Sequence, residues 1–161
     1  MPLPEQQFLV TLHSWSHSLH VRGYQRLGRC LEWTIRVVYS ATIPAAAVIG
    51  DGTVFGHNAL AVVLNPDTRI GKNCFIGTHV VVGGRHPHKG VPVLEDEVVV
   101  HAGAKLLGPI RIGQGATIGA NAVVLSDVPP GRLAVGVPAV VKERDGSTDE
   151  FLSDLLDRHP Q

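Results

Sequence analysis

Aliphatic residues recur every six positions through much of the chain. Six follow one another without a gap, and three more lie upstream in the same phase: Leu94, Val100, Leu106, Ile112, Ile118 and Val124, preceded by Ile70, Ile76 and Val82. A small or β-branched residue stands two places before most of these positions, and glycine follows several of them directly. An α-helix repeats about every 3.6 residues and a hairpin sheet turns roughly every eight to twelve, so neither fits. The period predicts a mainly β fold, a parallel β-helix of hexapeptide repeats, in which short strands stack coil on coil around the aliphatic side chains.

An earlier aliphatic block keeps the period but not the phase. Ile43, Ile49 and Phe55 are six residues apart, and their phase is offset by three from the later one. The change falls in the segment NALAVVLNPDT. We therefore predict an irregular coil at residues 58–68.

A second interruption lies between Val82 and Leu94, which are twelve residues apart. We predict that a loop at residues 85–91 replaces one rung of the repeat. This loop carries four basic or titratable side chains, which are Arg85, His86, His88 and Lys89. Loops that are merely tolerated tend to be rich in Gly, Ser and Asp, whereas loops held out by a rigid scaffold often carry function. The composition therefore favours a functional loop.

The segments on either side of the repeat are predicted to be helical. We expect an N-terminal helical segment at residues 1–41, the β-helix at residues 42–143, and a C-terminal helix or tail at residues 144–161. Two apolar faces are spaced for helices before the repeat, with a break at Gly23 between them: Phe8, Leu12, Trp15 and Leu19, then Leu27, Leu31, Ile35 and Val38. A capping box of Ser147 and Glu150 indicates the C-terminal helix.

Charge and composition argue against several classes of function. Fourteen Lys and Arg balance fourteen Asp and Glu, so no overall field attracts nucleic acid. The chain has no signal-like opening and no apolar run of about 18 residues, so we predict no secretion, no membrane span and a cytoplasmic location. Arginines line part of the second predicted helix: Arg22, Arg26, Arg29 and Arg36. They would suit an anionic membrane surface, but a collar that packs on the β-helix or on a neighbouring subunit is favoured.

Residues 42–143 resemble the serine acetyltransferase branch of the hexapeptide-repeat acyltransferases. The resemblance is carried by IPAAAVIGDGTVFGHN, VVLNPDTRIGKN, GGRHP, HAGAKLLGPIRIGQGATIGANAVVLSDVPPG and AVGVPAVV, of which the last two are the most specific. It implies a left-handed β-helix, a homotrimer, and transfer of the acetyl group of acetyl-CoA to a hydroxyl of L-serine or a serine-like compound, at a site between subunits. We expect no metal requirement, because no ligand spacing on a shared element demands one.

The resemblance also assigns residues to the reaction. His57, in FGHNA, matches the family's catalytic histidine, which would take the proton from the acceptor hydroxyl as its oxygen attacks the thioester carbonyl. His86, in GGRHP, matches the second histidine of the site, which helps to bind the acceptor. Arg85 beside it would hold a carboxylate or another anionic group, and Asn58 is a further acceptor-binding candidate.

The expected contacts with CoA are mainly to the backbone. Small residues at two turns would let the pantetheine arm lie along the main chain: Ala102, Gly103, Ala104, Gly119 and Ala120. Lys105 would reach a phosphate or, as an equal alternative, would be an ordinary surface lysine.

The chain departs from the family pattern at two carboxylates. The aspartate that precedes the catalytic histidine is Gly56 here, and a second aspartate, fifteen residues upstream of the histidine, aligns with Thr42. A histidine without its orienting carboxylate can still act as a base, with a less stabilised imidazolium. The C-terminus, DRHPQ, lacks the terminal isoleucine used to dock cysteine synthase, so no complex with that enzyme is expected.

These departures leave other functions open. A sugar or polysaccharide precursor is an alternative acceptor, and a non-catalytic β-helix trimer that serves as an assembly or regulatory partner is an alternative of another class. A γ-class carbonic anhydrase is disfavoured, since its three-histidine zinc pattern is not visible. The roles of three further histidines are open. His79 is expected to face the cleft near His57 or to be an ordinary turn residue, and His88 is an alternative to His86 as the base. His101 is expected to be exposed on an outer coil, where it would border the CoA channel of a neighbouring subunit.

Overall fold

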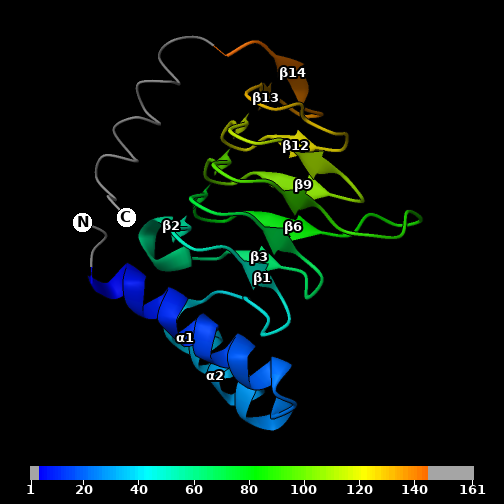
Figure 1. The fold of residues 1–161 in the computed structure, drawn as a ribbon. Coiled ribbons are helices and arrows are strands. Elements are labelled where there is room, and N and C mark those ends of the chain that lie inside the picture. Colours follow the sequence, from blue (N-terminus) through cyan, green and yellow to red (C-terminus); the bar gives the residue numbers. More distant parts are fainter. Residues whose placement is uncertain (1–3, 145–161) are drawn as a thin grey trace.

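The structure, a computed structural model, describes residues 4–144 as two helices followed by a parallel β-helix (Figure 1). The helices are α1 (Pro4–Val21) and α2 (Gln25–Tyr39), which pack against each other beneath the first coil. The predicted C-terminal helix, including Ser147 and Glu150, lies outside the described residues.

Three stacks of short strands form the three faces of the β-helix. Face 1 contains β1 (Val48–Ile49), β4 (Arg69–Ile70), β7 (Val93–Leu94) and β10 (Arg111–Ile112). Face 2 contains β2 (Val54–Phe55), β5 (Phe75–Ile76), β8 (Val99–Val100), β11 (Thr117–Ile118), β13 (Leu133–Val135) and β14 (Val140–Lys142), the last paired antiparallel to β13. Face 3 contains β3 (Val63–Leu64), β6 (Val81–Gly83), β9 (Lys105–Leu107) and β12 (Val123–Val124). Each coil therefore has three corners: corner 1 joins face 1 to face 2, corner 2 joins face 2 to face 3, and corner 3 joins face 3 to face 1.

The aliphatic positions of the six-residue period fill the core. The nine residues from Ile70 to Val124 on which the prediction rests are each at most 3% exposed. The small or β-branched residues two places earlier are buried as well: Thr68, Cys74, Val80, Val98, Ala104, Ala116 and Ala122. Gly77 shows why glycine follows, because a Cβ there would lie 2.6 Å from the backbone nitrogen of Ala102 on the next coil. The predicted fold class is confirmed.

The first interruption is a short helical turn between β2 and β3. This turn is η1 (Gly56–Ala59), and it separates the starts of the two strands by nine residues, whereas β5 and β6 start six residues apart. The three extra residues account for the change of phase. The irregular segment occupies residues 56–62, so it begins slightly before the predicted range of 58–68 and ends sooner.

The second interruption is a narrow loop that leaves the solenoid after β6 (Figure 1). Arg85 and His88 face each other across it in an isolated antiparallel bridge. The prediction that this loop replaces a rung is wrong. β6 on face 3 is followed directly by β7 on face 1, so the coil keeps all its sides and the loop is added at corner 3.

Polar side chains of α1 attach it to the first coil and to α2. The Nε2 of buried His13 lies 3.2 Å from the carbonyl oxygen of Pro44, and the Nδ1 of His17 lies 2.8 Å from that of Ala45. The hydroxyl of Ser16 donates to the carbonyl of Gly28 in α2 at 2.9 Å. The inner face of α1 is therefore partly polar.

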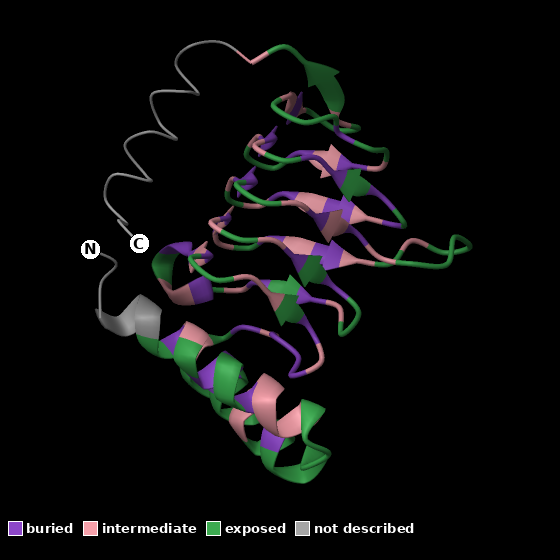
Figure 2. Ribbon diagram, viewed as in Figure 1, coloured by how far each residue is buried: buried purple, intermediate pink, exposed green. Residues whose placement is uncertain are grey.

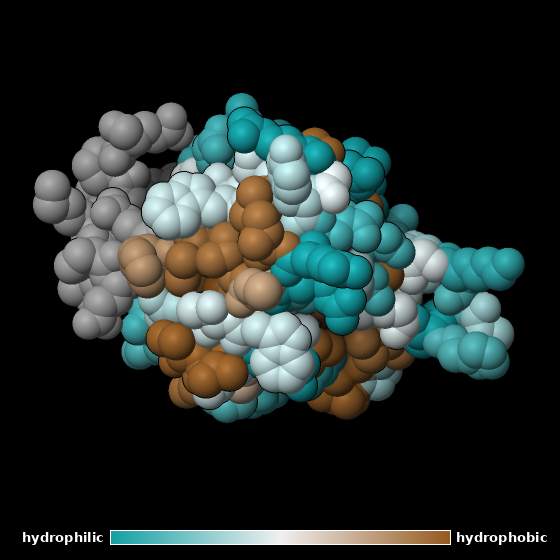
Figure 3. Space-filling view, turned by 90° about the horizontal axis from the view of Figure 1, so that it is seen from below, coloured by the Kyte–Doolittle hydropathy of each residue, from teal (hydrophilic) through white to brown (hydrophobic). Residues whose placement is uncertain are grey.

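The helices expose part of their two apolar faces (Figure 2). Phe8 and Trp15 in α1 are exposed, and so are Leu27 and Val38 in α2, although Leu12 and Ile35 are buried. In α1, His13 and Ser16 take inner positions, where their side chains hydrogen-bond to backbone carbonyls. Seen from below, hydrophobic side chains lie in patches between hydrophilic ones (Figure 3).

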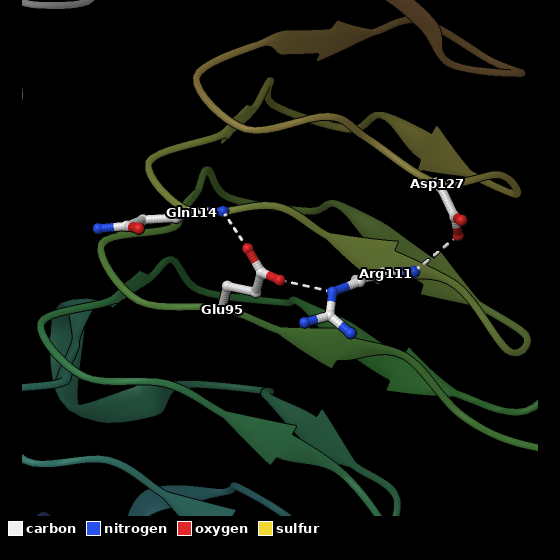
Figure 4. Close-up of polar contacts among 4 residues, drawn as sticks. All are labelled: Glu95, Arg111, Gln114 and Asp127. Carbon is white, nitrogen blue, oxygen red and sulfur yellow. Dashed lines mark hydrogen bonds and ion pairs between the residues drawn. The ribbon is translucent and has the colours of Figure 1, made fainter.

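Polar contacts on the outside of the solenoid join successive coils (Figure 4). Glu95 pairs with the Arg111 side chain and accepts a hydrogen bond from the backbone N–H of Gln114 at 2.7 Å. Asp127 accepts one from the backbone N–H of Arg111 at 2.8 Å. The hydrogen bond from Arg111 lowers the pKa of the Glu95 carboxyl. These contacts are away from corner 2, where the candidate site lies.

Candidate active site

Corner 2 stacks four turns of the chain in one column. From the first coil onward, these turns are residues 56–62, 77–80, 101–104 and 119–122. Backbone hydrogen bonds of 2.8–2.9 Å join successive turns through three donor and acceptor pairs: His79 to Leu60, Gly103 to Thr78, and Asn121 to Ala102. The fold therefore places the catalytic candidate His57 in the same column as the predicted CoA-binding turns.

A stretch of left-handed backbone presents His57. The φ angles of His57, Asn58 and Ala59 are 48°, 57° and 58°. Residues other than glycine adopt this conformation singly as a rule, and each costs about 1–2 kcal/mol. Strain of this kind gathers at functional sites. His57 is exposed between buried Gly56 and a buried Ala59, so the stretch holds the imidazole out from the corner.

A surface hollow of about 460 Å³ lies beside His57. Its lining residues are Val38, Tyr39, Ser40, His57, Asn58 and Leu60. The end of α2 forms one wall, because Ser40 leaves the helix in a left-handed conformation and its carbonyl accepts a hydrogen bond from Ala61 at 3.2 Å. No motif in the sequence pointed to Val38 and Tyr39 as site residues, because they precede the repeat. Asn58 was predicted, and it lines the hollow.

Thr42 and Gly56, which stand where the family pattern has aspartates, both have structural roles. Thr42 runs beside β3, donating its N–H to Val62 and accepting from Leu64 at 2.8 and 2.9 Å. Gly56 is buried against the ring of Phe75. Among the described residues, no carboxylate lies within ion-pair distance of the His57 imidazole. Within residues 4–144, the position of the His57 side chain is therefore set by its backbone and not by a carboxylate.

The upper turns of corner 2 present small groups to solvent. Ala102 and Ala120 are exposed, while the side chain of Ala104 is buried in the core, so Ala104 offers only its backbone. Gly103 and Gly119 are half-buried between them. The Lys105 ammonium donates to the carbonyl oxygens of Gly103 at 2.6 Å and His79 at 3.0 Å. It therefore ties two turns of the column together.

Arg85 and His86 belong to corner 3, not to corner 2. The loop that carries them and η1 project from opposite sides of the solenoid (Figure 1). Arg85 is half-buried, whereas His86 and His88 are exposed, and the His88 N–H donates to the Arg85 carbonyl at 2.8 Å. A single chain does not bring His57 and His86 together.

Two more histidines and one asparagine lie in the column at corner 2. His79 is exposed on the second turn. His101 on the third is half-buried, which lowers its pKa, so the expectation of an exposed residue is wrong in part. Asn121, on the fourth turn, was not predicted as a residue of this column. Its left-handed φ of 56° is a signal that could have been expected, because asparagine is one of the few residues that tolerate this conformation. Within residues 4–144, no group of three or more His, Cys, Asp or Glu is arranged to hold a metal, and no helix is long and apolar enough to cross a bilayer.

Comparisons with known proteins place this geometry in a family. Residues 92–126 match the family described as bacterial transferase hexapeptide (six repeats), and residues 67–107 match the hexapeptide repeat of succinyl-transferase. A serine acetyltransferase of Helicobacter pylori (strain J99) is 41% identical over 132 residues, which are 81% of this chain and 77% of that protein. The chain belongs to the serine acetyltransferase family. The predicted family is confirmed.

Other members of the serine acetyltransferase family are longer. The relative from Mycobacterium tuberculosis is 40% identical, and the match covers 80% of this chain and 57% of that protein. Soybean serine acetyltransferase complexed with serine has a TM-score of 0.81 at 38% identity, over 86% of this chain and 58% of that one. The enzyme from Brucella abortus in complex with coenzyme A has a TM-score of 0.83 at 28% identity, over 88% and 57%. The prediction of an acyltransferase that uses acetyl-CoA is confirmed at the level of the family.

Proposed function

We propose that this chain transfers the acetyl group of acetyl-CoA to the hydroxyl of L-serine or a serine-like acceptor, at a site between two subunits of a homotrimer. The observation that carries the proposal is the column at corner 2, in which His57 lies below the turns of Ala102 and Ala120. Structures of relatives with serine and with coenzyme A support the choice of acceptor and donor. We place the reaction in the cytoplasm, because acetyl-CoA carries several charges and does not cross membranes unaided.

The separation of His57 from His86 supports a shared site. In a cyclic trimer the interfaces are heterologous, so one surface of each subunit meets a different surface of the next. The loop at corner 3 extends well beyond its own coil (Figure 1). In the proposed trimer it reaches corner 2 of the neighbour, where Arg85 and His86 complete the site that one chain leaves open.

In this arrangement His57 is the general base. The acceptor oxygen attacks the thioester carbonyl while the imidazole takes the hydroxyl proton. The carbon–sulfur bond then breaks, and the departing sulfur receives that proton, so the products are the acetyl ester and free CoA. Arg85 holds the acceptor carboxylate through charge-assisted hydrogen bonds, and His86 and Asn58 hydrogen-bond its other polar groups.

The proposed CoA groove follows the exposed turns of corner 2. The pantetheine arm lies along the backbone of Gly103 and Gly119, next to the exposed methyl groups of Ala102 and Ala120. In this proposal Lys105 supports the groove through its hydrogen bonds to two turns, since its ammonium is already held by two carbonyl oxygens. No complex with cysteine synthase is proposed.

Release of free CoA thiol from acetyl-CoA, measured with L-serine and the purified protein, tests this function. In His57→Ala we expect a loss of at least about a hundredfold in kcat with the fold intact, because general base catalysis contributes about that much or more. In His86→Ala we expect mainly a higher KM for the acceptor. Tight CoA binding without release of CoA thiol in the presence of any acceptor would instead support the non-catalytic trimer.

A sugar or polysaccharide precursor is the second candidate acceptor. One observation favours it: the residues that line the hollow beside His57 include no carboxylate to pair with the ammonium of serine. A neutral hydroxyl compound would not need that partner. The same thiol assay, run with sugars and nucleotide sugars in place of serine, separates the two acceptors.

A further inference from the structure

The α2 helix carries an exposed surface that the β-helix does not use. We call it the basic apolar face, and it consists of Arg26, Leu27, Arg29, Cys30, Trp33, Arg36 and Val37. We propose that this face docks the protein on an anionic lipid membrane. The inference is independent of the proposed catalytic function.

The face is continuous along one side of α2. The helix buries Gly28 and Ile35 on its inner side, seven residues apart. Residues 26, 30, 33 and 37 follow one another at spacings of three or four, so they form a single stripe on the opposite side. Trp33 is 62% exposed and Val37 is 71% exposed. These side chains therefore face away from the protein's own core.

The charge of the face is complementary to anionic lipid. Arg29 and Arg36 lie beside the stripe, and Arg26 is its first residue. The Arg36 guanidinium lies 5.8 Å from the centre of the Trp33 ring. Glu32 is the one acidic residue of α2, and it is half-buried, with its carboxylate 3.5 Å from the backbone nitrogen of Ala45. The whole chain has no net charge, so the excess of three arginines over one glutamate in α2 is local and does not come from a basic composition.

The aromatic residues fit the same partner. Both tryptophans of the chain lie in the two helices, and Trp15 is 57% exposed like its counterpart in α2. The underside, where the helices lie, mixes hydrophobic patches with hydrophilic ones (Figure 3). Arginine on the polar side and Trp with aliphatic residues on the other are typical of helices that lie in the plane of a membrane interface. Neither described helix is long and apolar enough to span a bilayer, so the contact is peripheral.

Charge argues against a second copy of the chain as the occupant. Two such faces pressed together would place three arginines against three arginines, and like charges across an interface are unfavourable. In the proposed trimer, cyclic symmetry would put the three faces at the same end of the assembly, where they could bind one membrane together. Such multivalency strengthens a contact that is weak for one helix.

Flotation with lipid vesicles tests the proposal without any substrate. We expect the protein to bind vesicles that contain phosphatidylcholine and phosphatidylglycerol, and not to bind vesicles that contain only phosphatidylcholine. Salt at about 1 M should release the bound protein. In the full-length Trp15→Phe variant all tryptophan emission comes from Trp33, and we expect it to shift to the blue on binding. Arg29→Gln with Arg36→Gln should lower partitioning at least about thirtyfold.

The matched control removes the same charge elsewhere. Arg69→Gln with Lys142→Gln changes two exposed cationic residues of the β-helix and should leave vesicle binding almost unchanged. Equal loss in both double variants, or equal binding to neutral and anionic vesicles, would overturn the proposal. A blue shift of Trp33 that depends on protein concentration without vesicles, together with doubling of the mass in sedimentation, would assign the face to a second copy instead.

Discussion

The ring of Phe75 lies against Gly56, so close that a Cβ on Gly56 would be 3.1 Å from its Cζ atom. Position 56 is where the family resemblance places an aspartate beside the catalytic histidine. The backbone there is not left-handed, so it is the neighbouring ring, and not the φ angle, that favours glycine. The Phe75 ring on the next coil therefore occupies space that a side chain at position 56 would need, which accounts for glycine in place of the aspartate.

Gly56→Ala should lower the free energy of unfolding by about 1–3 kcal/mol, as expected when a methyl group is forced into a packed site. In a Phe75→Ala background the same change should cost almost nothing, because the ring that it meets is gone. Denaturant unfolding of the four proteins of this double-mutant cycle measures the coupling. Additive effects would mean that the backbone, and not the ring, excludes a side chain at position 56.

Co-expression of two inactive variants tests whether the site is shared. Trimers of His57→Asn alone and of His86→Asn alone should both be impaired, because every site lacks one histidine. In random mixtures about a quarter of the sites would join an intact His57 from one subunit to an intact His86 from the next, if the interface is heterologous. Purification through two different tags on the subunits keeps only the mixed trimers, in which about one site in three is intact, and thiol release should recover in that proportion. No recovery would mean that both histidines act within one chain.

The hexapeptide period predicted the core because an inward side chain has one requirement, to be aliphatic and of the right size. Ile70 and Ile118 meet it far apart in the chain, and both are buried. The separation of His57 from His86 could not be predicted in the same way. All three faces share one period, and the face on which a residue falls depends on the three residues added at η1 and on the loop at corner 3.

The inner face of α1 could not be predicted from hydrophobicity for a different reason. Trp15 is the more apolar residue, yet Ser16 is buried, because its hydroxyl donates to the Gly28 carbonyl of α2. His13 is buried against Pro44 in the same way. Such side chains are placed by a backbone acceptor from a distant segment, and the sequence around them contains no trace of that partner.

Large side chains on the exposed turns of corner 2 should block the proposed CoA groove. Ala102→Tyr and Ala120→Tyr should each raise the KM for acetyl-CoA at least about tenfold, a loss of about 1.4 kcal/mol of binding. The free energy of unfolding should change little, because both methyl groups already face solvent. Gln114→Tyr, an exposed position at corner 1 of the same coil as Ala120, is the control and should bind acetyl-CoA normally. Unchanged KM values in both alanine variants would place CoA elsewhere.

The attachment of α1 to the β-helix should weaken in acid through His13. Burial lowers the pKa of His13 to about 4, whereas an unfolded histidine binds its proton at about 6.5. The unfolded chain therefore takes up the proton first, so stability is complete above about pH 6.5 and is lost as the pH falls toward 4, by about 3 kcal/mol in total. Thermal unfolding measured across this pH range should show a loss of unfolding free energy in the wild type. In His13→Gln the loss should be smaller by about 3 kcal/mol, because only the other groups still titrate. His20→Gln, in the last turn of the same helix, should keep the full pH dependence. If His13→Gln keeps the full pH dependence as well, another group binds the proton, and His13 does not cause the loss of stability in acid.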